Sequence, residues 1–166
     1  QLAVQLGKVP IFVKDAPGFL VNRLLGFYMR EALHLVQEGA DFAEVDRALR
    51  KFGMPMGPFE LIDAVGVDIA DHVANNLAAA FPDRISEATL TSMMKKNGWL
   101  GCKSKAGFYK YGKNGKRSGK NSDTVDLLGS SQQKNVAAPT NQELWIRPVY
   151  AMLSEAGWAL EEKVVP

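Results

Sequence analysis

Apolar side chains recur at helical spacing along much of this chain, and breaks rich in glycine and proline separate the stretches. The longest early stretch begins after Pro17-Gly18 and ends near Gly39. Apolar residues at steps of three and four share one face of a helix. The pattern therefore predicts an amphipathic helix of about five turns, whose first turn carries the polar pair Asn22 and Arg23. Its apolar positions are Val21, Leu24, Leu25, Tyr28, Ala32, Leu35 and Val36.

Shorter helices are expected after this one, each beginning or ending at a recognisable local signal. Asp41 and Glu44 predict an acidic capping box for the next helix, and Asp68 predicts another cap further along. The glycines and prolines of 53–58 favour a tight connector. Pro148 is expected to bend the last helix. We expect these helices at about 42–51, 59–65, 68–81, 88–97 and 141–163.

Three segments do not read as long helices. The run Val9–Lys14 is rich in β-branched and aromatic residues and predicts a short strand, with Pro10 at an edge or a strand start. Residues 107–111 favour a short extended segment. Residues 112–139 are rich in Gly, Ser, Lys, Asn and Gln, and predict a flexible linker around one brief helix near Val125–Leu128. Because all the long predicted elements are helices, the expected fold class is all-α.

The last predicted helix resembles the first. At an offset of 124 residues, four residues recur: arginine at 23 and 147, glutamate at 31 and 155, alanine at 32 and 156, and glutamate at 38 and 162. A lone helix of a duplicated unit cannot bury its own apolar face. We therefore expect residues 140–166 to be the first helix of a truncated second repeat.

The composition is that of an ordinary globular protein, with 46% hydrophobic and 23% charged residues. No apolar run approaches the ~20 residues that a membrane span needs. The chain begins with Gln1 and has no signal-peptide pattern, so we expect a piece of a longer polypeptide. The single cysteine, Cys102, excludes an internal disulfide and a cysteine-based zinc site, which favours a reducing compartment.

Positive charge is concentrated in one segment. Residues 103–120 carry seven basic and no acidic side chains, whereas the net charge of the chain is +2. One functional hypothesis is therefore a helical interaction module whose basic loop binds anionic partners. Few aromatic residues accompany the basic ones, and the flanking chain is acidic, so we expect no nucleic-acid binding.

Three motifs follow one another along the chain: Lys8–Leu25, Gly53–Asp63 with Val65-Gly-Val-Asp68 after it, and Gly107-Phe-Tyr-Lys-Tyr111. Taken together, they resemble the 3-hydroxyacyl-CoA dehydrogenases. Lys8–Leu25 resembles the junction between their nucleotide-binding and helical domains. Gly53–Asp63, followed by Val65-Gly-Val-Asp68, resembles their Pro-Met-Gly-Pro loop and the helix junction after it. Gly107-Phe-Tyr-Lys-Tyr111 resembles their Gly-Phe-Tyr signature. The resemblance covers 8–111 in order.

The resemblance implies a helical domain like the C-terminal domain of 6-phosphogluconate dehydrogenase. It would span 15–111, with 1–14 as the tail end of a missing NAD-binding domain and a short strand left from it. Residues 112–139 would be the linker. Substrate in this family reacts in the cleft where the helical domain closes over the nucleotide-binding domain.

The implied activity is NAD-dependent oxidation of an L-3-hydroxyacyl-CoA to a 3-ketoacyl-CoA in fatty acid β-oxidation. Asn22 matches the active-site asparagine of the family, and an amide can donate to a thioester or keto oxygen without changing its charge. Lys103 matches a lysine that reaches the NAD phosphate, although the chain departs from the usual pattern, with Cys102 in place of a basic residue and Lys105 in place of a glycine. No metal is implied.

The proton-relay histidine, its glutamate and the glycine-rich phosphate loop of the family all belong to the missing domain. His34 and His72 do not lie in the family's catalytic context, so we expect the isolated chain to be inactive. The implied partners are acyl-CoA, the NAD-binding domain, and a second copy in a homodimer or a thiolase subunit.

The apparent second repeat favours a multifunctional β-oxidation protein fused to an enoyl-CoA hydratase. Its location would be the bacterial cytoplasm, or alternatively the mitochondrial matrix or peroxisome. A 3-hydroxybutyryl-CoA or other β-hydroxyacid dehydrogenase remains an alternative.

Overall fold

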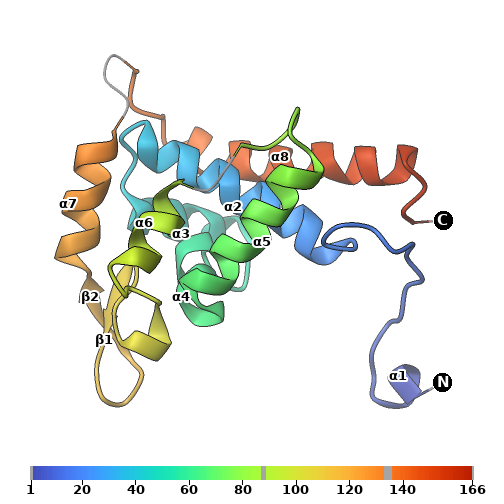
Figure 1. The fold of residues 1–166 in the computed structure, drawn as a ribbon, viewed down its shortest axis with the longest axis horizontal. Coiled ribbons are helices and arrows are strands. Elements are labelled where there is room, and N and C mark those ends of the chain that lie inside the picture. The colour runs from blue at the N-terminus through green and yellow to red at the C-terminus, as the bar shows by residue number, and fades with distance from the viewer. Residues whose placement is uncertain (1, 87–88, 133–135, 166) are drawn as a thin grey trace.

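The computed structural model describes residues 2–86, 89–132 and 136–165, and their fold is mainly helical (Figure 1). A two-stranded antiparallel sheet is the only sheet among these residues. This confirms the all-α prediction. The elements are α1 (Leu2–Gln5), α2 (Val21–Gln37), α3 (Phe42–Phe52), α4 (Pro58–Val65), α5 (Val67–Ala80), α6 (Thr89–Lys96), the 3-10 turn η1 (Cys102–Ser104), β1 (Tyr109–Tyr111), β2 (Arg117–Lys120), α7 (Ser122–Ser131) and α8 (Glu143–Glu161).

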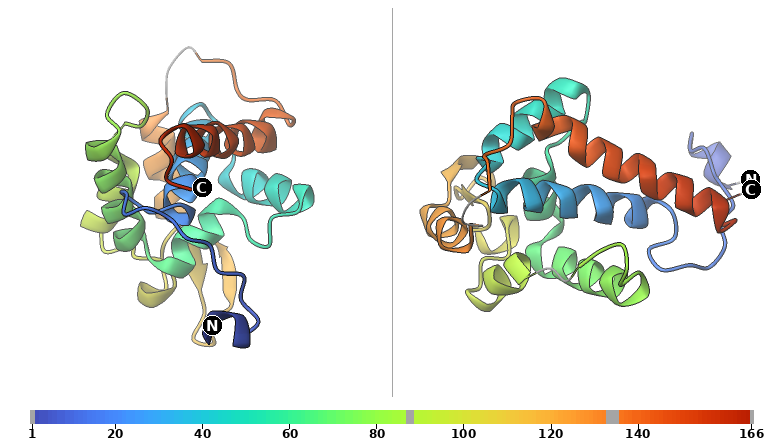
Figure 2. Two further views of the ribbon diagram at one scale, coloured as in Figure 1. Left: turned by 90° about the vertical axis from the view of Figure 1, so that its right-hand side faces the viewer. Right: turned by 90° about the horizontal axis from the view of Figure 1, so that it is seen from above.

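Helices α2 and α8 run side by side along the length of the molecule (Figure 2), and α3, α4 and α5 also contact α2. The core lies between these helices. Its fully buried members include aromatic and aliphatic side chains from α2, α3, α4 and the segment before β1: Tyr28, Leu35, Val45, Leu49, Phe59, Ile62 and Phe108. Of the predicted apolar positions of α2, Tyr28, Ala32, Leu35 and Val36 are buried as their spacing predicted, whereas Val21 is 60% exposed.

Most predicted helices have the expected bounds because local signals set them. The Asp41 side chain accepts hydrogen bonds from the backbone N–H groups of Ala43 and Glu44, at 2.8 and 3.4 Å, which caps α3. Helix α6 matches the segment expected near 88–97, although the predicted first residue, Ala88, lies outside the described residues. Pro148 lies inside α8.

The cap expected at Asp68 is wrong. Helix α5 begins one residue earlier, at Val67, and Gly66 occupies the cap position with a φ of 110°. Asp68 is therefore inside the first turn, where its carboxylate forms an ion pair with Lys103. A negative charge in the first helical turn is still favourable, because it faces the positive end of the helix dipole.

The strand expected at Val9–Lys14 does not form. This segment is irregular, and Val9 and Phe12 are 91% and 89% exposed. A strand needs a neighbouring strand to receive its hydrogen bonds. The described residues provide none here, and the backbone N–H of Lys14 bonds instead to the carbonyl of Val164 at 2.9 Å.

The flexible linker expected at 112–139 is wrong for its first part, because residues 117–131 form a strand and a helix. β2 pairs with β1, and α7 follows and includes the predicted Val125–Leu128 helix. The side chains of Asn121 and Thr124 donate to the backbone carbonyl of Gly107, at 2.9 and 2.7 Å, and Leu128 is buried. These contacts attach 117–131 to the helical domain. Residues 133–135 of the predicted linker lie outside the described residues.

The sequence likeness of α2 and α8 has a structural counterpart in two sets of ion pairs. Arg23 of α2 bonds to Glu155 of α8 and to Glu162, which caps the end of α8, at 2.5 and 2.8 Å. Arg147 of α8 bonds to Glu31 of α2 and to Glu38, which caps the end of α2, at 2.7 and 2.5 Å. The two sets are equivalent: Arg147 lies 124 residues after Arg23, and Glu31 and Glu38 lie 124 residues before Glu155 and Glu162. The two antiparallel helices therefore present the same charges to each other, as two copies of one surface do across a two-fold axis.

Candidate functional site

Asn22 lines the opening of an apolar cavity of about 200 Å³ between α2, α4 and α5. The wall from α2 comprises Asn22, Leu25 and Met29, which follow each other at three and four residues and so share one helix face. The α4 and α5 walls are aliphatic. They consist of Leu61, Ile62, Val65, Ile69, Ala70 and Val73. Val65 and Ile69 are about half exposed, which leaves one side of the cavity open.

A tight turn places Asn22 at the start of α2. Gly18 has a φ of 72°, and Phe19 also has a positive φ, of 50°. The backbone N–H of Arg23 donates to the carbonyl of Gly18 at 3.2 Å. A Cβ on Gly18 would lie 2.8 Å from the nitrogen of Arg23, so only glycine fits both the space and the left-handed conformation. The Pro-Gly pair of the sequence thus determines where the helix begins.

The carboxamide of Asn22 is exposed, and within the described ranges it forms no side-chain hydrogen bond. The cavity residues named above include no ionisable side chain. An amide in this place can donate to or accept from a bound oxygen, but it cannot remove a proton at neutral pH. The cavity therefore combines an apolar wall with one neutral amide, and none of its lining residues is a general base.

The two histidines lie away from this cavity, as the sequence indicated. His34 contacts Glu31 at 3.2 Å on the α8 side of α2. His72 is exposed and contacts Asn76 at 3.1 Å on α5. Neither lines the space beside Asn22.

Lys103 lies in the turn η1, against the N-terminus of α5. Its ammonium group forms an ion pair with Asp68, and the hydrogen bond from Lys103 holds the pKa of that carboxyl below its usual value. The residue after Asp68, Ile69, lines the cavity. Lys103 itself does not line the cavity, and its charge already has a partner. A phosphate would have to compete with Asp68 or share the lysine with it.

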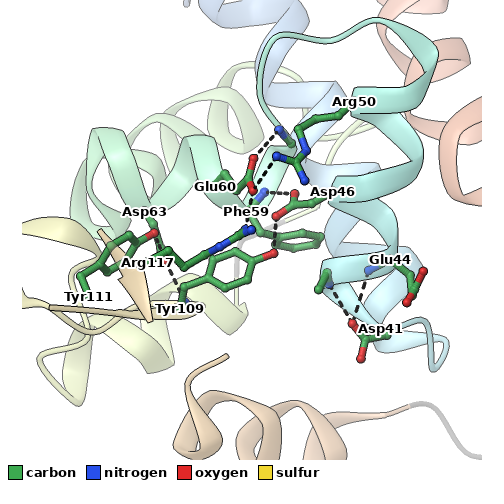
Figure 3. Close-up of polar contacts among 12 residues, drawn as sticks. Asp41, Glu44, Asp46, Arg50, Phe59, Glu60, Asp63, Tyr109, Tyr111 and Arg117 are labelled. Carbon is green, nitrogen blue, oxygen red and sulfur yellow. Dashed lines mark hydrogen bonds and ion pairs between the residues drawn. The ribbon is translucent and has the colours of Figure 1, made fainter. Parts of the chain in front are cut away.

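Two further family motifs meet through buried carboxylates (Figure 3). Asp46 of α3 accepts from the Phe59 backbone N–H at 2.9 Å and from the Tyr109 hydroxyl at 2.5 Å. Asp63 of α4 accepts from the backbone N–H groups of Phe108 and Tyr109, each at 2.9 Å. The Pro-Met-Gly-Pro-Phe and Gly-Phe-Tyr motifs therefore hold α3, α4 and β1 together. Their role here is structural.

Sequence reasoning missed Asp46 and underrated Asp63. Both are at most 1% exposed, and burial raises their pKa values, that of Asp46 to about 7. The available signal was the position of Asp46 between Val45 and Leu49 on the apolar side of its helix. A carboxylate on a buried face needs donors, and these come from residues 13 to 63 positions away.

The basic segment 103–120 is largely neutralised by the molecule's own acids. Lys103 pairs with Asp68, Arg117 with Glu60, and Lys120 with Asp41, and Lys110 lies 3.9 Å from Asp123. Lys105, Lys113 and Lys116 form no ion pair within the described part of the chain. Because four of the seven charges are engaged, the segment offers a weaker field to an anionic partner than its composition indicated.

The described residues provide no cluster of three or more metal-ligating side chains. Lys103, the one residue expected to contact NAD, is paired with Asp68. No helix in the described ranges is both long and apolar enough to span a bilayer.

Residues 18–111 match the C-terminal domain of 3-hydroxyacyl-CoA dehydrogenase. This match extends over more than half of the chain, and it contains Asn22, both buried aspartates, Lys103 and the Gly-Phe-Tyr motif. The chain therefore belongs to the 3-hydroxyacyl-CoA dehydrogenase family, as the motifs indicated.

Solved structures agree with this assignment. (S)-3-hydroxybutyryl-CoA dehydrogenase PaaH1 from Ralstonia eutropha is 39% identical over 68% of this chain and 41% of its own, with a TM-score of 0.62. Two others share the fold at 23% identity. They are the 3-hydroxybutyryl-CoA dehydrogenase of Escherichia coli K12 (TM-score 0.75, 99% of this chain and 51% of its own) and the dehydrogenase part of multifunctional enzyme 1 from C. elegans (TM-score 0.76, 98% and 36%).

The last two structures match nearly the whole chain, so the shared fold includes α7 and α8. This chain in turn spans about half the length of the E. coli protein and little more than a third of the C. elegans one.

Proposed function

We propose that this chain supplies the helical, acyl-binding side of the active site in an NAD-dependent L-3-hydroxyacyl-CoA dehydrogenase of fatty acid β-oxidation. The observation that carries the proposal is the position of Asn22, an exposed carboxamide at the opening of an otherwise apolar cavity. An acyl chain can lie along the aliphatic wall while the amide meets its oxygen-bearing end.

The amide of Asn22 would donate an N–H to the thioester or keto oxygen of the substrate. A fixed donor stabilises negative charge on that oxygen without reorganising during the reaction. Removal of one such donor typically costs about 3 kcal/mol of transition-state stabilisation.

The rest of the chemistry requires a second domain. Oxidation of a 3-hydroxyl group releases a proton and a hydride, and the cavity around Asn22 contains no group that accepts a proton. We infer that a nucleotide-binding domain brings the general base and most of the NAD site, with Lys103 as one contact from this chain. The chain alone is then inactive.

Binding tests the proposal on the chain itself. Titration with acetoacetyl-CoA, followed by nuclear magnetic resonance, should shift the signals of the cavity residues Leu25, Met29 and Ile69. Shifts confined to the surface lysines of 105–116 would instead support the alternative of a basic anion-binding module.

Turnover tests the role of Asn22 in the complete dehydrogenase. Asn22→Ala should lower kcat about 100-fold, in line with a lost donor, and leave the affinity for NAD nearly unchanged. Asn76→Ala removes an exposed amide on α5 that contacts His72, and should have no effect. Equal losses of turnover and NAD affinity in Asn22→Ala would mean that Asn22 serves folding.

The size of the cavity bears on the length of the acyl chain in the substrate. Two of the similar structures are 3-hydroxybutyryl-CoA dehydrogenases, and the cavity wall on α2 extends only from Asn22 to Met29, roughly 10 Å along the helix. We propose that kcat/KM is highest for four- to six-carbon substrates, a range set by this ~10 Å wall. An increase from 3-hydroxybutyryl-CoA to 3-hydroxyhexadecanoyl-CoA would contradict this.

We further infer that α8 begins a second repeat, as in a multifunctional enzyme. Tyr150, Leu153 and Leu160 of α8 are 55–61% exposed. Their counterparts 124 residues earlier are Gly26, Met29 and Val36, which pack inside the helical domain. The outer face of α8 is therefore expected to be covered, by further helices of the repeat, a second copy or a thiolase subunit.

A further inference from the structure

Arg23, the residue next to Asn22, is anchored by a distant part of the chain. Its side chain is 0% exposed, and it bonds to Glu155 and Glu162 on α8, at 2.5 and 2.8 Å. Burial acts to lower the pKa of Arg23, but the hydrogen bonds that Arg23 donates to Glu162 and Glu155 outweigh it and raise that pKa. The arginine thus remains charged, and among the described residues its ion-pair partners lie more than 130 positions away.

A second arginine closes the network. Arg84 bonds to Glu155 at 3.3 Å and to Glu162 at 2.9 Å. The ring of Phe81 lies 4.4 Å from the guanidinium carbon of Arg23 and 4.3 Å from that of Arg84. The start of α2, the turn after α5 and the last turns of α8 are therefore joined around one buried cluster.

The start of α2 is fixed in its backbone by the turn at Gly18, where the Arg23 N–H donates to the Gly18 carbonyl at 3.2 Å, but it has no side-chain cap. Leu20, at the cap position, makes no side-chain hydrogen bond to the first turn. The first N–H groups of a helix lack intrahelical partners, and uncapped helix ends fray. Arg23 lies in this first turn, so its bonds to α8 take the place of a cap in fixing the turn that presents Asn22.

We propose that Glu155 and Glu162 are positioning residues for Asn22: through Arg23 they hold the first turn of α2 so that the Asn22 amide faces the cavity. The positioning is a property of this chain. Its consequence for catalysis rests on the function proposed above.

The molecule contains its own control for this proposal. The ion pairs of Arg147 with Glu31 and Glu38 repeat the same chemistry at the opposite end of the α2–α8 pair. Glu38 is 16 residues from Asn22, which is roughly 24 Å along the helix. Loss of the Arg147–Glu38 ion pair therefore weakens the contact between α2 and α8 without changing the first turn of α2.

The first experiment measures Asn22 directly in this chain. Glu162 and Glu38 are both partly exposed, so Glu162→Gln and Glu38→Gln should both fold, whereas Glu155→Gln removes a buried charge. In nuclear magnetic resonance spectra, Glu162→Gln should shift the Asn22 side-chain amide signals and accelerate hydrogen exchange at residues 22–24 by about tenfold. Glu38→Gln should leave both unchanged. Unchanged Asn22 signals in Glu162→Gln, or equal changes in the two variants, would overturn the proposal.

The second experiment measures turnover in the complete dehydrogenase. Glu162→Gln should lower kcat by about tenfold with a smaller change in KM, Glu162→Asp should recover part of it, and Glu38→Gln should match the wild type. Equal kcat values in Glu162→Gln and Glu38→Gln would overturn the catalytic part. If Asn22→Ala were itself fully active, the proposed function would fail, while the resonance result would still decide whether α8 positions the first turn.

Discussion

Asp46 shows how a single residue can make this fold sensitive to pH. It is 1% exposed, and burial raises its pKa to about 7, although Tyr109 and Phe59 donate to its oxygens. In the unfolded chain its pKa returns to roughly 3.9. The folded state therefore binds the proton more tightly than the unfolded state does.

The expected consequence is a loss of stability as pH rises. The contribution of protonated Asp46 is fully present below about pH 4 and disappears as pH increases through about 7. Asp46→Asn mimics the protonated form, so the free energy of unfolding of the wild type should fall relative to this variant across that range, by a few kcal/mol. Urea titrations at several pH values measure this difference in the free energy of unfolding between the two proteins. Parallel curves for the two proteins would show that Asp46 stays ionised in the fold.

Gly107 illustrates a residue whose size is decisive. A Cβ at this position would lie 2.0 Å from an Asp63 carboxylate oxygen and 2.7 Å from the Cα of Gly101. Gly107→Ala should therefore destabilise the protein by about 2–3 kcal/mol. Gly129 on α7 is the matched control, since nothing lies within 4 Å of its added Cβ. Gly129→Ala should be neutral or stabilise by up to about 1 kcal/mol. Thermal unfolding of both variants tests the contrast, and similar melting temperatures would contradict it.

Among the elements, β2 and α7 depend on a few anchoring contacts. Asn121 is fully buried, caps α7 through the Asp123 N–H at 3.3 Å, and donates to the Gly107 carbonyl at 2.9 Å. These bonds explain why a segment of linker-like composition is ordered. The element forms because the domain beside it offers a carbonyl group.

Asn121→Ala should release this attachment. The variant leaves buried partners unsatisfied and should lose about 2–3 kcal/mol of stability. Limited proteolysis should then cut within 112–131 faster than in the wild type. Asn114→Ala serves as the control, because Asn114 is exposed and contacts only the nearby Lys116 N–H at 3.1 Å. If both variants are cut at the wild-type rate, the bonds of Asn121 do not hold the segment.

At the scale of the whole molecule, α8 is held on α2 by two chemically equivalent but unequally buried ion-pair clusters. The Arg23 side chain is 0% exposed, whereas that of Arg147 is 28% exposed. Solvent weakens an exposed pair, and a buried charge that loses its partner is costly. The two ends of the helix pair should therefore contribute differently.

Arg23→Ala should destabilise the protein by about 3–5 kcal/mol, because it leaves the buried carboxylate of Glu155 with Arg84 as its remaining ion-pair partner. Arg147→Ala should cost about 1 kcal/mol, and less at high salt. Urea unfolding at low and high ionic strength compares them. Equal costs would mean that burial does not distinguish the two clusters.

Local order was readable from the residues. The apolar spacing of α2, the cap at Asp41 and the glycine and proline breaks act over about four residues, so the helices could be placed to within one or two positions. The motifs that define the family are also contiguous in sequence, which is why the sequence alone identified Asn22 as the candidate residue.

Only the tertiary structure decided which distant groups meet. Residues 9–14 have β-forming side chains but no partner strand among the described residues, while 117–131 has the composition of a linker and is held by Gly107. The partners of Arg23, and the aliphatic walls around Asn22, come from separate helices. Pattern within a segment reports local conformation, whereas burial, ion pairing and cavity shape depend on contacts between residues far apart in the chain.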